Sequence, residues 1–173
     1  PEVPEGYNYD FVNADALVNV LGVENGNITT PAGTTYRLLV LDDNARYMTL
    51  AVLKKIDELV NAGAVIAGDK PIATPSLSDD ATEFLTIVDR LWANEKGENI
   101  IGKGKVLAGM KVGDALEKMK INPDFTYSKP ENDTKLMFVH RKAGNTDFFW
   151  VNSRNARVQD IEAEFRVTGK EAE

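Results

Sequence analysis

The chain of 173 residues contains no cysteine and one histidine, His140. Without cysteine there are no disulfides, no thiolate nucleophile and no thiolate zinc site, and the absence identifies no compartment. A single histidine excludes a metal site with several imidazole ligands and leaves at most a lone acid or base.

The chain also has fewer basic than acidic residues, with 20 Lys and Arg and 27 Asp and Glu, which gives a net charge of −7. This charge opposes nonspecific binding to nucleic acid and to anionic membrane surfaces. No apolar run approaches the roughly 20 residues that a membrane-spanning helix needs. We therefore expect no nucleic acid and no membrane among the partners.

The chain begins Pro1-Glu2-Val3-Pro4, without a start methionine, a basic leader or an apolar signal segment. This beginning predicts an excised segment of a longer protein. The 173 residues suffice for one α/β domain, or for a small domain and part of another.

A strand, a helix and a second strand are predicted between Tyr36 and Gly68. The apolar run 37–41 is typical of a strand buried on both faces. Thr49 is a predicted N-cap for a helix with its apolar residues at helical spacing, and Gly63 is its C-cap. The run 64–67 is the second strand, and a helical crossover makes the two strands parallel.

Further elements are predicted on both sides of this crossover. A short strand at 9–12 precedes a helix capped by Asn13, and Asn25-Gly26 predicts a hairpin. After 68, a helix capped by Ser78 leads to a third parallel strand at 104–108 and a last helix. We therefore predict a flavodoxin-like, class I amidotransferase-like α/β domain over 1–126: a parallel sheet with flanking helices.

Residues 127–173 alternate apolar and polar side chains instead, which predicts three antiparallel strands, the start of a truncated β-sandwich. Such a small sheet leaves one apolar face in water, so we expect it to dock on the α/β domain or to pair with another copy, as a homo-oligomer.

Several stretches, in this order, resemble the α-L-rhamnosidases of glycoside hydrolase family 106, in the region that follows their catalytic barrel. They are GYNYDFVNADAL, YRLLVLDDNARYMTLAVLKKIDELVNAGAVIAGDKP, TPSL, GKGKV and FVHRKAGNTDFFWVNSRN. The resemblance implies a parent enzyme whose (β/α)-barrel lies outside this chain, and it leaves a periplasmic or secreted location for the parent open. No position here matches a catalytic or calcium-binding motif of the family.

Asp42-Asp43-Asn44, at the carboxyl end of the first predicted strand, occupies the place where open α/β sheets bind ligands. In a receiver domain, however, the phosphorylated aspartate would follow the third strand, whereas Asp69 follows the very next one. The two carboxylates would also repel a flavin phosphate. We interpret this segment as a solvated loop, and Gly102-Lys103-Gly104-Lys105 as a turn without the spacing of a phosphate loop.

The second domain contains the remaining candidates. His140 is interpreted as a structural, hydrogen-bonded imidazole. Tyr127, Phe148 and Trp150 have aromatic faces that suit sugar rings, but their strand spacing favours core positions. Glu162 and Glu164 share a strand face and suggest a glycosidase pair, although solvated carboxylates explain them more simply.

We therefore expect a non-catalytic accessory segment of a glycoside hydrolase, with a structural or subunit-contact role and the parent's catalytic barrel as its partner. No residue is assigned as catalytic, cofactor-binding or metal-binding, and no cofactor is expected. The alternative is a stand-alone α/β ligand-binding or receiver-like signalling domain.

Overall fold

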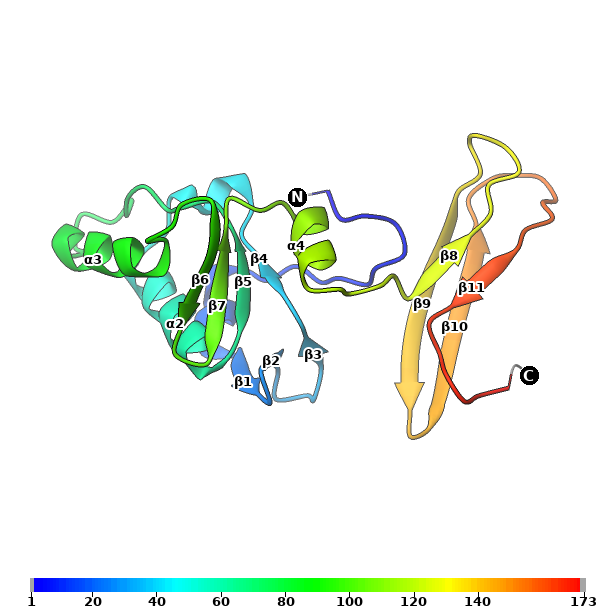
Figure 1. Cartoon of the computed structure of the whole chain (residues 1–173), viewed down its shortest axis with the longest axis horizontal. Helices are drawn as coiled ribbons and strands as arrows, with labels where there is room; N and C mark the ends of the chain where they lie inside the picture. The colour runs from blue at the N-terminus through cyan, green and yellow to red at the C-terminus, as the bar shows by residue number, and fades with distance from the viewer. Residues whose placement is uncertain (1, 172–173) are drawn as a thin grey trace. The chain divides into compact units, whose positions relative to one another are not determined.

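The computed structural model describes residues 2–171, which form two compact units (Figure 1). Among these residues, the first unit contains Glu2 and 11–118, and the second contains 3–10 together with 119–171. The amide of Asp124 donates to the carbonyl of Gly6 at 2.7 Å, and the hydroxyl of Tyr7 donates to the carbonyl of Ile121 at 2.8 Å. The first unit thus ends before the boundary predicted at 126, and residues 3–10, which include part of the predicted strand at 9–12, belong with the second unit.

The first unit is built on a mixed four-stranded sheet of order β4-β5-β7-β6. Three strands are parallel as predicted: β4 (Leu39–Val40), β5 (Val65–Gly68) and β7 (Gly104–Ala108). The fourth, β6 (Gly97–Ile101), was not predicted and runs antiparallel to β7. The strand expected to be buried on both faces, β4, is shorter than its apolar run and only half-buried, because it lies at the edge of the sheet.

Helices cover both faces of this sheet. Ile66, Val106 and Ala108 belong to the same core as the buried side chains of α2 (Leu50–Ala62) and α3 (Ala81–Leu91). The helix α4 (Val112–Lys118) lies on the opposite side of the sheet in Figure 1. Salt bridges from Lys54 to Glu83 and from Arg90 to Asp57, both at 2.7 Å, join α2 to α3 on their solvent side.

The caps of α2 are confirmed and that of α3 is corrected. The hydroxyl of Thr49 accepts from the amide of Val52 at 3.4 Å, and Gly63 ends the helix at φ 127°, where a side chain would be strained. The N-cap of α3 is Asp80 instead of Ser78, because its carboxylate accepts from two backbone amides. Leu85 lies outside the buried stripe of α3 and is 49% exposed.

The beginning of the first unit is a helix and a small three-stranded sheet. Asn13 caps α1 (Ala14–Asn19) as predicted, since its side chain accepts from the amide of Ala16. Asn25 and Gly26 have positive φ, as the predicted hairpin turn requires, and join two strands, to which a third adds: β1 (Gly22–Glu24), β2 (Asn27–Thr29) and β3 (Thr35–Tyr36). The strand predicted at 9–12 does not form, because the chain passes from one unit to the other there.

The second unit contains two antiparallel pairs of strands. One pair is β9 (Leu136–Ala143) with β10 (Thr146–Ser153), and the other is β8 (Phe125–Tyr127) with β11 (Ala163–Phe165). The antiparallel strands were predicted, but β11 pairs with β8 and does not continue the β9–β10 sheet. No helix among residues 2–171 is both long and apolar enough to cross a bilayer.

Asp79 links the loop before α3 to the start of α2. Its carboxylate accepts from the amide of Leu50 at 2.7 Å and from the hydroxyl of Thr74 at 2.5 Å. These hydrogen bonds, the one from Leu50 above all, hold the pKa of Asp79 below its usual value of 3.8. A depressed pKa means that the ionised carboxylate stabilises the fold above pH 3.8 and that this contribution is lost as the pH falls through the folded-state value.

We expect Asp79→Asn to lower the melting temperature at pH 7, and the difference from wild type to shrink below pH 3.8, as the wild-type carboxylate becomes protonated. Circular dichroism melts between about pH 7 and about pH 2.5 measure this difference. Asp43→Asn is the matched control, since Asp43 is exposed. A difference that stays constant over the whole range would contradict the assigned role of the carboxylate.

Candidate functional site: the exposed face of the β9–β10 hairpin

The β9–β10 hairpin has two chemically different faces. Side chains alternate across a strand, and the register, in which Phe149 lies opposite His140 and Trp150 opposite Val139, determines which residues share a face. One face, here called the inner face, contains half-buried Leu136, Phe138, His140, Phe149 and Val151. The other, here called the outer face, contains Met137, Val139, Arg141, Phe148, Trp150 and Asn152, all of them exposed.

The inner face is covered by the aromatic side chains of β8 and β11. The ring of Phe125, only 2% exposed, lies 5.2 Å from Phe138 and 5.2 Å from Phe165 between centroids. Phe165 in turn meets Phe149 edge-on at 4.8 Å. Aromatic pairs at these separations stabilise a core beyond the area that they bury. The second unit therefore has a hydrophobic core of its own, made by two facing pairs of strands.

Tyr127 was predicted to be a core residue, and this is confirmed. It is half-buried, its ring stacks on Phe125 at 5.5 Å, and its hydroxyl accepts from the amide of Leu136 at 3.1 Å. The same prediction is wrong for Phe148 and Trp150, which are 56% and 76% exposed. The reason is register, because both lie on the outer face of the hairpin, while their neighbour Phe149 takes the core position.

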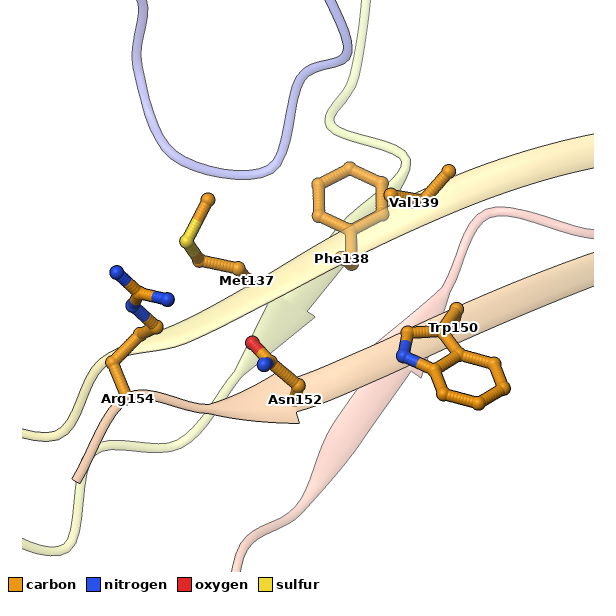
Figure 2. A pocket seen from close by; sticks show the side chains of 6 residues that line it. All are labelled: Met137, Phe138, Val139, Trp150, Asn152 and Arg154. Carbon is orange, nitrogen blue, oxygen red and sulfur yellow. The ribbon is translucent and has the colours of Figure 1, made fainter. Parts of the chain in front are cut away.

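The outer face exposes several apolar side chains and has a shallow hollow in it. Met137 and Val139 are 51% and 42% exposed and lie opposite Asn152 and Trp150. The hollow has a volume of about 240 Å³ and is open to solvent (Figure 2). Its lining residues are Met137, Phe138, Val139, Trp150, Asn152 and Arg154. An exposed apolar patch of this kind is typical of an interaction site.

His140 lies on the inner face between two carboxylates. Its Nε2 is 2.7 Å from Asp147 and its Nδ1 is 3.5 Å from Asp124, while the ring stacks on Phe149 at 4.2 Å. Lys170 pairs with Asp147, and Arg166 pairs with Asp124. The imidazole of β9 thus binds Asp147 of β10 and Asp124, just before β8, and these two carboxylates bind the C-terminal segment. This confirms the predicted structural, hydrogen-bonded histidine.

The electrostatics of this cluster oppose a role in proton donation. Lys170 above all, and then His140, lower the pKa of Asp147 from 3.8 to about 2 by donating to its carboxylate. A carboxyl group that donates a proton near neutral pH needs a raised pKa instead. Asp147 therefore stays ionised and acts as an anchor for the Lys170 and His140 side chains.

The acidic segment after β4 is solvated, as predicted. Asp42, Asp43 and Asn44 are exposed, and the Asp42 carboxylate caps a short 3₁₀ helix (Asp43–Arg46) by accepting from the amides of Asn44 and Ala45. The start of α2, where a flavodoxin-like sheet would bind a phosphate, is occupied by the Asp79 carboxylate. At this edge of the sheet, carboxylates of the chain itself therefore accept hydrogen bonds from the backbone amides at the helix starts.

The remaining candidates lie apart from one another. Glu162 and Glu164 are exposed, with Glu164 opposite Thr126 in the β8–β11 ladder. Gly102 and Lys103 form the tight turn between β6 and β7, and Gly102 has a φ of 57°, so the predicted turn is confirmed. Among residues 2–171 no three His, Asp or Glu side chains are grouped in a way that could hold a metal ion.

The sequence and the fold are similar to those of carbohydrate-active enzymes. The model of glycoside hydrolase family 106, described as alpha-L-rhamnosidase, matches residues 1–173. A protein of Formosa agariphila named "Putative beta-glucuronidase" is 29% identical over 177 residues, which are all of this chain and 14% of that protein. The structure of a rhamnosidase from Novosphingobium sp. PP1Y is 36% identical with a TM-score of 0.88, over 97% of this chain and 16% of that one. The chain thus spans about a sixth or less of the length of these two relatives.

One face of the hairpin is covered and the other is open, so loss of a phenyl ring should destabilise the second unit unequally on the two sides. Phe165 of β11 packs against the inner face through Phe149, whereas Phe148 lies on the outer face. We expect Phe165→Ala to lower the free energy of unfolding of the second unit by about 2 kcal/mol, below the usual range for a fully buried Phe because this ring is partly exposed. Phe148→Ala, on the outer face, should change it by less than about 0.5 kcal/mol.

Urea unfolding followed by tryptophan fluorescence measures both variants. Hydrogen–deuterium exchange at increasing urea, measured peptide by peptide, complements it, because peptides from the first and the second unit report their unfolding separately. Equal destabilisation by the two substitutions would contradict the division into a covered and an open face.

Proposed function

This chain belongs to glycoside hydrolase family 106, the α-L-rhamnosidases, and we propose that it is a non-catalytic accessory segment of such an enzyme, with a structural or subunit-contact role. The observation that supports this proposal is the use of its carboxylates. Asp42, Asp79 and Asp80 accept from backbone amides at helix starts. Asp124 and Asp147 are bound to His140 and to cationic side chains.

Glycoside cleavage needs two carboxyl groups on opposite sides of the scissile bond, about 5–5.5 Å apart in retaining enzymes and about 6.5–9.5 Å apart in inverting ones. One of them must have a raised pKa in order to protonate the leaving group. Asp124 and Asp147 flank an imidazole where a sugar would have to lie, and the pKa of Asp147 is lowered to about 2. This pair therefore suits a structural role better than a catalytic one.

The proposed partner is the remainder of a longer hydrolase, including its catalytic barrel. Support comes from the lengths of the relatives, since the chain covers only 16% of the solved rhamnosidase while it matches that fold over 97% of its own length. We propose that the β4–α2–β5 crossover, whose two strands are parallel, belongs to a flavodoxin-like, amidotransferase-like α/β domain over residues 1–126. We also propose that the chain pairs with a second copy as a further subunit contact.

The alternative, a stand-alone ligand-binding or receiver-like signalling domain, is less well supported. A receiver-like site would use the acids at the carboxyl ends of the parallel strands to hold a divalent cation. Here Asp42 is engaged by two amides, and Asp79 occupies the start of α2. The same groups are therefore used to stabilise helix starts.

We expect the 173-residue chain to release no aryl alcohol from an aryl α-L-rhamnoside, because no convergent acid and second carboxylate act on one bond. Product release measured by absorbance, against Asp147→Asn and Glu162→Gln as matched variants, tests this. Turnover above background in the wild type that either variant abolishes would overturn the proposal.

A further inference from the structure

The outer face of the β9–β10 hairpin presents one large aromatic side chain to solvent. Trp150 is 76% exposed, and it lies opposite Val139 on the neighbouring strand. In Figure 2 the indole stands at one end of the hollow and Arg154 at the other, with Asn152 between them. An indole is an apolar surface with a polar N–H at its edge, and the C–H groups on one face of a pyranose ring are matched to such a surface.

Polar groups at the same hollow add hydrogen-bonding capacity. The amide of Asn152 offers two donors and an acceptor, and the guanidinium of Arg154 offers a fork of N–H donors that matches a carboxylate. Within residues 2–171 neither side chain has a hydrogen-bond or ion-pair partner, and both belong to the lining of the hollow. Donors and acceptors that converge on an apolar floor are the usual composition of a small-molecule site.

The size and charge of the hollow narrow the choice of ligand. Its volume of about 240 Å³ is below the range of about 300–1,000 Å³ for sites that enclose drug-sized ligands, and so it suits a single sugar ring. The charged side chains at this face are Arg141 and Arg154, both cationic, in a chain with a net charge of −7. This local reversal of sign favours an anionic ligand.

We propose that the outer face of the β9–β10 hairpin is a binding site for an acidic carbohydrate, in which a pyranose ring stacks on Trp150 while Arg154 pairs with the carboxylate of a uronic acid residue. Asn152 binds the ring hydroxyls between them. The proposal goes beyond the accessory role proposed above, on which it does not depend.

A protein partner, either another part of a longer hydrolase or a second copy, is the competing occupant of this face. It would pack on the apolar side chains Met137, Val139 and Phe148 as well as on Trp150. The open hollow and its polar side chains without partners fit a hydrated sugar better, because burial of unpaired polar groups under an apolar partner is unfavourable.

Fluorescence titration of the 173-residue chain tests the proposal directly. Trp92 is fully buried, so changes in the emission on addition of ligand report on Trp150. The probes are a trimer of galacturonic acid and a neutral glucose trimer of equal length. We expect the acidic trimer to shift the emission with saturation and to bind about tenfold more tightly than the neutral one, with an affinity that weakens as salt is added.

Substitutions separate the two contacts. Trp150→Ser should weaken binding of the acidic trimer about tenfold or more, measured by calorimetry because the fluorophore is lost. Arg154→Gln should remove the preference for the acidic trimer and leave binding of the neutral one unchanged. The control, Ile100→Ser, alters a side chain of the first unit that is 78% exposed and should bind as wild type does.

Three outcomes would overturn the proposal. The first is absence of binding of either trimer by the wild-type chain, with all variants folded by circular dichroism. The second is that the wild-type chain binds the two trimers with equal affinity and that Arg154→Gln changes neither affinity. The third is self-association of the wild-type chain in sedimentation that Trp150→Ser abolishes, without any sugar binding, which would assign the face to a contact between copies.

Discussion

Alternation of side chains across a two-stranded sheet is the constraint on which the second unit depends. Every residue of the β9–β10 hairpin points either to the aromatic layer of β8 and β11 or away from it. Because that layer covers one face only, Phe149 becomes a core residue while its neighbours Phe148 and Trp150 remain exposed. The position of the core and the position of the candidate binding face are therefore two results of the same register.

Electrostatic contacts reinforce this arrangement, and similar contacts engage an acid of the first unit. The His140 imidazole and the side chains of Lys170 and Arg166 join strands and the C-terminal segment through Asp147 and Asp124. In the first unit, Asp79 fixes a loop to the start of α2. Their hydrogen-bond donors hold the pKa values of Asp147 and Asp79 below the usual value, which suits anchoring and opposes proton donation.

Local signals in the sequence predicted local structure well. Thr49, Gly63, Asn13 and the Asn25-Gly26 turn all act as predicted, because capping and turn preferences depend on few neighbours. Pairing between distant segments was harder to predict. The antiparallel β6 and the β8–β11 ladder were missed, since the period of a strand does not identify its partner. The exposure of Trp150 was missed for the same reason, as alternation alone does not say which face of a hairpin is covered.

In the folded chain the outer face of the β9–β10 hairpin is open to solvent, while β8 and β11 cover the inner face. Hydroxyl-radical footprinting with mass spectrometry measures this side chain by side chain in the native protein. We expect rapid oxidation of Trp150, Phe148 and Met137, and protection of Trp92 and Phe125. Protection of Trp150 in the free, monomeric chain, at a level comparable to that of Trp92, would contradict this expectation.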